Sequence, residues 1–160
     1  MILIAYDGSE NGRATIAQAG VLFPGEPATV LTVWRRFVDT VARLGAGVGL
    51  LVDSGEADES FEQTAAEQAQ QGAELALQAG LNATARTAVV DSTIADTILA
   101  EAAACGANAI VVGSRGRSGV RSLMLGSVSH NVLQHADLPV VVVPSPKVAQ
   151  ARAKRRHERA

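Results

Sequence analysis

Five short apolar runs alternate with four longer segments of helical periodicity, and this alternation limits the fold more than any other feature of the chain. The runs, mostly rich in β-branched residues, predict strands at Ile2–Tyr6, Ala28–Trp34, Ala83–Val90, Ala109–Gly113 and Pro139–Pro144. The helical segments are Ser9–Phe23, Ala57–Ala79, Ser92–Cys105 and Ser127–His135. Nearly continuous apolar strands separated by helices favour a parallel sheet covered on both faces and joined by right-handed crossovers. The predicted class is therefore α/β.

The composition favours one compact domain without a membrane segment. The chain has 160 residues, and because only 3% are aromatic its core is expected to consist of Val, Leu, Ile and Ala. Cys105 is the only cysteine, so it cannot form an internal disulfide, which fits a reducing compartment. The apolar stretches are far shorter than a membrane span, and Met1 is followed directly by an apolar run without a charged leader. We therefore expect a cytoplasmic protein without a membrane partner.

The net charge of −2 conceals a basic C-terminal tail. Residues 1–144 carry eight Lys and Arg against 15 Asp and Glu, whereas residues 145–160 carry six against one. Such a tail is typical of a solvated end or a short helix, and the alternative is an electrostatic contact with nucleic acid or a membrane surface. Because no aromatic residues are interleaved with these charges and no folded nucleic-acid module is recognisable, nucleic acid is not an expected partner.

The segment Arg35–Glu56 interrupts the alternation of strands and helices. Its "GAGVG" does not match the dinucleotide-binding fingerprint GxGxxG, because the third glycine comes one position early and no strand precedes it closely. The segment is therefore predicted to be an inserted mobile loop or a short apolar lid.

Helix ends carry the expected local signals. Ser9, Ser92 and Ser127 are each placed to cap the start of a helix with a side-chain oxygen. Gly80 and Gly106 suit helix exits, which need a residue that tolerates positive φ.

Two loops follow strands at the edge of the sheet where open parallel sheets bind their ligands. After the first strand, Asp7 ends the strand, Gly8 permits a tight turn and Ser9 opens a helix. After the fourth strand comes "GSRGRSGVRSLMLGSVS", residues 113–129. These loops are expected to meet at one site.

The second loop has the chemistry of a phosphate site. Gly113 and Gly116 are expected to let the backbone turn sharply and approach a ligand closely, because neither carries a Cβ. Gly126, Ser127 and Ser129 begin a helix whose free N–H groups and dipole favour an anion. Further positive charge is available from the arginines of the loop, Arg115, Arg117 and Arg121.

Missing motifs exclude several kinds of phosphate chemistry. The chain has neither the P-loop GxxxxGK[ST] nor the paired glycines of the SGGxDS pyrophosphatase loop. His130, His135 and Cys105 lack the spacing of a metal site. Ser127 and Ser129 are weak nucleophile candidates, because no base can be assigned to them. The residues therefore indicate binding more than turnover; the alternative is a slow ATPase, or an autokinase with one of these serines as phosphoacceptor.

At these residues the chain resembles the universal stress protein family. Gly113-x2-Gly116-x9-Gly126-Ser127 is similar to the family's nucleotide-binding signature, and Asp7-Gly8-Ser9 to its opening. "GSVSHNVLQHADLPVVVVP", residues 126–144, resembles its closing helix and strand. The resemblance covers residues 1–144 as one nucleotide-binding domain; the insertion 35–56 and the tail 145–160 lie outside the pattern.

The resemblance implies a single-domain, Rossmann-like three-layer sandwich with a five-stranded, mainly parallel sheet and helices on both faces. It also implies ATP binding, because the non-binding branch of the family loses the glycines that this chain keeps. Asp7 and the backbone near Ala5 would meet the adenine or ribose end of ATP, and Val33 would line the adenine pocket. Trp34 is placed to stack on a base, or else serves as packing. The implied contacts with ribose and phosphates are Val112, Gly113, Gly116, Gly126, Ser127, Val128 and Ser129. A divalent cation, Mg²⁺ or Mn²⁺, often accompanies ATP in the family, and its ligands stay unassigned.

The resemblance further implies a regulatory stress-response protein that forms a homodimer through its last strand. Pro139–Val143 suits this role physically, because an apolar, uncharged edge strand invites pairing with a partner. The alternative is an edge covered by the C-terminal tail.

Overall fold

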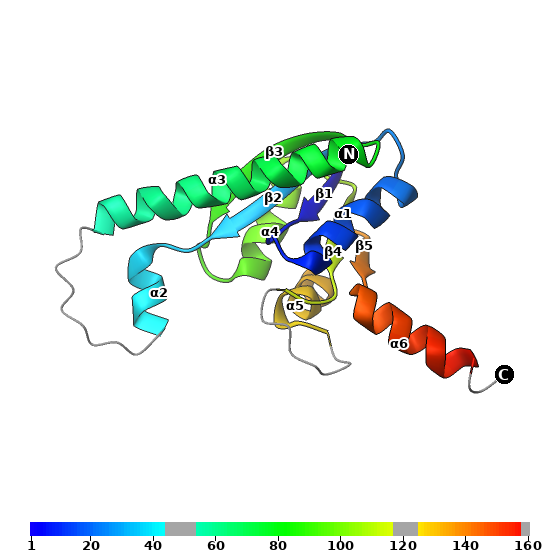
Figure 1. Ribbon diagram of the computed structural model, residues 1–160. Coiled ribbons are helices and arrows are strands. Elements are labelled where there is room, and N and C mark those ends of the chain that lie inside the picture. The colour runs from blue at the N-terminus through cyan, green and yellow to red at the C-terminus, as the bar shows by residue number, and fades with distance from the viewer. Residues whose placement is uncertain (44–53, 117–124, 158–160) are drawn as a thin grey trace.

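The computed structural model describes residues 1–43, 54–116 and 125–157 and has one five-stranded parallel sheet in the order β3-β2-β1-β4-β5 (Figure 1). The strands are β1 Ile2–Ala5, β2 Pro27–Trp34, β3 Asn82–Val89, β4 Ala109–Gly113 and β5 Val140–Val143. The helices are α1 Glu10–Leu22, α2 Phe37–Arg43, α3 Ser54–Gln78, α4 Ile94–Ala104, α5 Ser127–His135 and α6 Pro146–His157. The predicted α/β class is confirmed, and the expected strands and helices lie within about three residues of their predicted ends.

Two apolar cores lie on opposite faces of the sheet, which gives the Rossmann-like three-layer sandwich. Ile4 and its neighbours pack with Ile16 of α1 and with the alanines of α3. Leu3 points to the other face and packs with Ile98 of α4 and Val132 of α5. Because successive side chains of a strand point to opposite faces, β1 must be apolar at every position, as its sequence is.

The starts of α1 and α4 are fixed by side-chain caps. The Ser9 Oγ accepts a hydrogen bond from the Gly12 N–H at 3.0 Å, as predicted. The prediction for Ser92 is wrong by one residue, because Thr93 has the extended N-cap backbone and its Oγ1 accepts from the Asp96 N–H at 3.1 Å.

Of the other predicted helix ends, two are confirmed and one is wrong. Gly80 and Gly106 adopt φ of +87° and +67° after α3 and α4, as expected. The cap prediction for Ser127 is wrong, because Gly126 is the N-cap of α5 and Ser127 is already helical. A glycine N-cap has no side chain to satisfy the first amides of the helix, which matters for the site described below.

The inserted segment is not simply a loop where the structure describes it. Its first part forms α2 and its last residues begin α3, whereas "LGAGVGLLV" lies outside the described residues. The Phe37 N–H donates to the Asp58 Oδ1 of α3 at 2.6 Å, and the Phe37 and Phe61 rings lie 6.2 Å apart. The helix α2 is therefore attached to α3 by a hydrogen bond and an aromatic contact.

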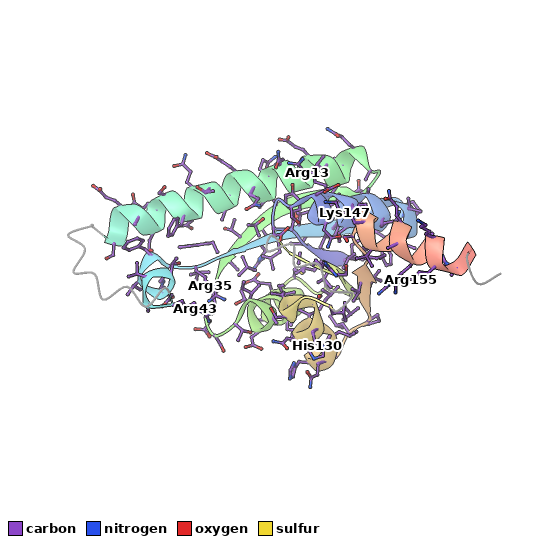
Figure 2. The ribbon with its side chains drawn as sticks, turned by 60° about the horizontal axis from the view of Figure 1, so that its bottom comes forward. Arg13, Arg35, Arg43, His130, Lys147 and Arg155 are labelled. Atoms are coloured by element: carbon purple, nitrogen blue, oxygen red, sulfur yellow. The ribbon has the colours of Figure 1, made fainter. Side chains whose placement is uncertain are left out.

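The basic tail forms α6, which carries exposed Lys147, Arg152, Lys154, Arg155 and Arg156. It follows β5 directly, and β5 is an edge strand, as the sequence predicted. The helices α2 and α6 lie at opposite ends of the molecule in both views (Figures 1 and 2). Among the described residues no helix is both long and apolar enough to cross a membrane.

Candidate functional site

The strand β1 ends earlier than its two neighbours and leaves an opening between them. Its last residue, Ala5, lies opposite Leu31, and β2 continues beyond this level to Trp34. On the other side, Ile4 lies opposite Val111, and β4 continues to Gly113. The chain leaves β1 in one direction to form β2 and β3 and returns to form β4 and β5 on the other side. Ligands of open α/β sheets bind at such a reversal.

Backbone groups of β2 face this opening. The Tyr6 N–H donates to the Leu31 carbonyl at 2.9 Å, and the Val90 N–H donates to the Trp34 carbonyl at 2.8 Å. Because backbone groups alternate between the two sides of a strand, Val33 directs its N–H and carbonyl toward the β1 side, beyond the last residue of β1. A donor and an acceptor therefore lie side by side where no strand continues, a pair that suits the edge of a nucleobase.

A cavity of about 580 Å³ occupies the opening. Its lining contains every residue predicted for the site: Ala5, Asp7, Val33, Val112, Gly113, Gly116, Gly126, Ser127, Val128 and Ser129. Its volume is in the range of ordinary small-molecule pockets. The structure thus brings the predicted residues together, although they come from four separate segments of the chain.

The start of α5 forms one end of this pocket. The first hydrogen bond within the helix runs from the His130 N–H to the Gly126 carbonyl at 2.9 Å. The amides of Ser127, Val128 and Ser129 precede it and have no acceptor within the helix, and the glycine N-cap supplies no side-chain acceptor. These donors and the positive end of the helix dipole favour a phosphate group.

The Ser129 hydroxyl, which the sequence offered as a conceivable phosphoacceptor, is engaged within the protein. Its side chain is buried, and its Oγ donates toward the carbonyls of Gly126 at 3.0 Å and Ser114 at 3.3 Å. The Gly126 N–H also donates to the Ser114 carbonyl, at 2.8 Å. The Ser129 hydroxyl therefore links the second loop to the start of α5. Only the backbone N–H of Ser129 stays available there as a donor for a ligand. A phosphoacceptor role fits this hydroxyl poorly.

The glycines of the second loop are needed for packing within the protein. Neither Gly113 nor Gly116 has a positive φ, so neither position depends on the backbone freedom of glycine. A Cβ on Gly113 would lie 2.6 Å from the Asn11 Nδ2, so this glycine is required by packing against α1. A Cβ on Gly116 would lie 3.0 Å from the Asp7 Oδ2, so this glycine lets the second loop approach the first.

Hydrogen bonds hold the two loops in this arrangement. The Asn11 Nδ2 donates to the Arg115 carbonyl at 2.7 Å and so joins α1 to the second loop. The Asp7 Oδ1 accepts from the Ser9 N–H at 3.1 Å, and Gly8 has φ of +76°, which confirms the predicted tight turn. One carboxylate oxygen of Asp7 thus stabilises its own turn while the other faces Gly116.

The far side of the pocket was anticipated from the sequence only through Trp34 and through the alternative of a lid at residues 35–56. It is formed by the end of β2, by α2 and by α3, and its polar and aromatic lining residues are Trp34, Arg35, Thr40, Phe61, Thr64 and Gln68. The available signal was "WRRF" at the end of β2, where aromatic and cationic residues cluster at a strand end. Partial burial and the nearby Arg43 lower the pKa of Arg35, and Asp39 opposes this shift. Arg117 and Arg121 lie outside the described residues.

No metal site accompanies the pocket within residues 1–43, 54–116 and 125–157, where no group of three or more His, Cys, Asp or Glu side chains could hold an ion. Ligands for a divalent cation stay unassigned. A magnesium ion that accompanies a nucleotide is typically held by the phosphates and water with only one or two carboxylates.

The comparison with protein families decides what kind of domain carries this pocket. A model of the universal stress protein family matches residues 1–144. The chain belongs to this family. Universal stress protein YxiE of Bacillus subtilis (strain 168) is 32% identical over 161 residues, which cover 89% of this chain and 97% of that protein.

Three solved structures illustrate the similarity of fold. The hypothetical protein MJ0577 has a TM-score of 0.69 at 21% identity, covering 89% of this chain and 94% of that one. A universal stress protein from Archaeoglobus fulgidus in complex with dAMP has a TM-score of 0.56 at 21% identity, with coverages of 89% and 95%. A universal stress protein in complex with cAMP has a TM-score of 0.59 at 19% identity, with coverages of 90% and 95%. At these identities the likeness concerns the fold.

Proposed function

We propose that this universal stress protein binds ATP in the pocket at the end of β1 and acts as a cytoplasmic regulatory protein of the stress response. The observation that carries the proposal is the pairing of open strand-end backbone groups with uncapped helix amides in one cavity of about 580 Å³. Two proteins of the same fold are described in complex with the adenine nucleotides dAMP and cAMP, which supports an adenine nucleotide as the ligand class.

The nucleotide would lie with its base toward β2 and its phosphates toward α5. Val33 offers a backbone donor and acceptor to the base edge, and Ile94 and Ile98 provide apolar surface beside it. Asp7 lines the same cavity, and its Oδ2, which faces Gly116, would accept a hydrogen bond from a ribose hydroxyl. The amides of Ser127 and Val128 would then hold the phosphates.

The same proposal includes a homodimer formed by antiparallel pairing of two β5 strands. The Val143 carbonyl accepts from the Ser114 N–H of β4's extension at 2.7 Å, so by alternation Val140 and Val142 direct their backbone groups to the open edge. The half-buried valines of this strand supply apolar surface beside the unpaired edge.

The test is to purify the protein without added nucleotide, denature it, and identify the released small molecules by chromatography and mass spectrometry. Release of near-stoichiometric ATP supports the proposal, and release of ADP moves weight to the hydrolytic alternative. A protein that releases no nucleotide is titrated with ATP, with and without Mg²⁺, by calorimetry. Absence of binding in both titrations contradicts the proposal.

A further inference from the structure

The far wall of the pocket is formed by the end of β2, by α2 and by α3 and has its own chemistry. Trp34 is the last residue of β2, and Arg35 follows it. Both line the cavity, as do Thr40 of α2 and Phe61 of α3. The wall is held in place by the hydrogen bond and the ring contact between Phe37 and α3 described above. It therefore adds aromatic side chains and an arginine to the cavity lining, on the β2 side of β1, whereas the start of α5 lies on the β4 side.

Arg35 is the polar centre of this wall. It is half-buried, and within the described ranges no carboxylate forms an ion pair with its guanidinium. Arg43 lies near enough to disfavour its charge, and Asp39 compensates only in part. Figure 2 shows Arg35 and Arg43 together at the α2 end of the molecule, far from Lys147 and Arg155 of α6. A partly desolvated guanidinium beside a second one is best neutralised by an anion.

The pocket thus attracts anions at two separate ends. The amides of α5 and the loop at Gly116 follow β4, whereas Arg35 follows β2, and these two strands lie on opposite sides of β1. Asp7, which follows β1, lines the cavity between them. The phosphates of ATP are contiguous, so a single triphosphate chain placed at α5 leaves Arg35 without a partner. A ligand that satisfies both ends needs a second phosphate beyond its first nucleoside.

We propose that the pocket takes a dinucleotide, whose first 5′-phosphate lies at the start of α5, whose second phosphate pairs with Arg35, and whose second base packs on Trp34 and Phe61. This inference rests on the proposed nucleotide site and extends it. Guanidinium and phosphate form bidentate, charge-assisted hydrogen bonds, and an indole ring offers a stacking surface to any base. Arg35 and Trp34, in this account, select for the length of the ligand.

The probe is 5′-phosphorylated diadenylate, pApA, compared with AMP, which is its 5′ half. Both are titrated by calorimetry against the full chain at one fixed salt concentration. The wild-type protein should bind pApA at least about tenfold more tightly than AMP, a factor that corresponds to about 1.4 kcal/mol. In Arg35→Gln the ratio of the two affinities should fall to near one.

The matched control is Arg36→Gln, because Arg36 is the adjacent arginine, is exposed, and does not line the cavity. This variant should keep the wild-type ratio. Circular dichroism checks that each variant is folded, and Trp34→Leu gives an independent variant of the same wall that should also lower the ratio.

The outcomes distinguish failure of the dinucleotide proposal from failure of the nucleotide site itself. If AMP and ATP bind but pApA binds no better than AMP, the dinucleotide proposal is overturned while the nucleotide site stands. If Arg36→Gln reduces the ratio as much as Arg35→Gln does, the gain comes from general surface charge and the proposal is equally overturned. If none of the three ligands binds, the proposed function itself fails, and the dinucleotide proposal with it.

Discussion

Substitution of Gly113 by alanine tests whether this glycine serves the ligand or the packing of the protein. The new Cβ would lie 2.6 Å from the Asn11 Nδ2 and 3.0 Å from the Thr15 Oγ1. Asn11 is 6% exposed and Thr15 is fully buried, so neither side chain can move into solvent. The Asn11 Nδ2 also donates to the Arg115 carbonyl at 2.7 Å. Any movement of Asn11 that relieves the clash therefore weakens the link between α1 and the second loop.

The expected loss of stability follows from these two effects. Insertion of a carbon atom into a packed interior costs about 1–3 kcal/mol. Loss of the hydrogen bond that the Asn11 Nδ2 donates adds about 1 kcal/mol. The Asn11 Oδ1 already has no partner within the described residues, so this side chain would then keep no hydrogen bond there. We expect Gly113→Ala to lower the free energy of unfolding by about 2–4 kcal/mol, a fall in Tm on the order of 10 °C for a chain of this size.

The assay is urea denaturation of four proteins: the wild type, Gly113→Ala, Asn11→Ala and the double variant. Because Asn11→Ala removes the atoms that the new Cβ meets most closely, the alanine at position 113 should cost about half as much in that background. Additive effects within about 0.5 kcal/mol would refute the packing explanation. A Gly113→Ala protein of wild-type stability that no longer binds ATP would refute it as well, and would restore the view that this glycine makes room for phosphate.

Four further predictions concern the site and the edge of the sheet. Gly116→Val should abolish the ATP-dependent stabilisation, about 2.7 kcal/mol at a hundredfold excess over Kd, without unfolding the chain; unchanged ATP affinity by calorimetry contradicts the loop assignment. Asp7→Ala should weaken ATP but not pyrophosphate, and an equal loss of both would mean that Asp7 mainly holds its turn through Ser9. Because folding lowers the pKa of Arg35, the folded chain holds this proton less tightly than the unfolded chain, so the charged side chain opposes folding at neutral pH, and this opposition fades only as the pH rises above the lowered pKa toward the ordinary one. Arg35→Gln should therefore leave the ligand-free protein at least as stable in urea at pH 7, and a clear loss of stability would contradict this sign. Val142→Pro removes an N–H that faces the open edge while keeping the pairing with β4, so light scattering should find a folded monomer; a folded dimer would argue against the β5 interface.

Much of the architecture could be predicted from local sequence signals. Leu3 and Ile4 lie on opposite faces of β1, and both are apolar. This local pattern alone predicts a strand buried between two layers of helices. Ser9 is directly followed by a helical pattern, and its cap forms as expected. The error at Ser92 has a local cause, because Thr93 is an equally good cap and only the backbone conformation decides between the two.

The individual roles at the site were less predictable. Gly113 is needed for its contact with Asn11, which is about a hundred residues away in the chain. The Ser129 hydroxyl is occupied by the carbonyls of Gly126 and Ser114, and no spacing in the sequence indicates this. The insertion resembled a loop because its glycines outnumber its helical signals, whereas α2 is stabilised by contacts with α3.

The sequence by itself determined the alternation of strands and helices, the polar residues at strand ends and the membership of residues 1–144 in a family. These properties depend on periodicity and on residue types within short windows, where steric preference and hydrophobic burial act locally. Only the tertiary structure decided that β1 ends short between β2 and β4, that Asp7 meets Gly116, and that Arg35 reaches the same cavity as α5. Those facts depend on how distant segments pack against one another, and packing is a property of the whole chain.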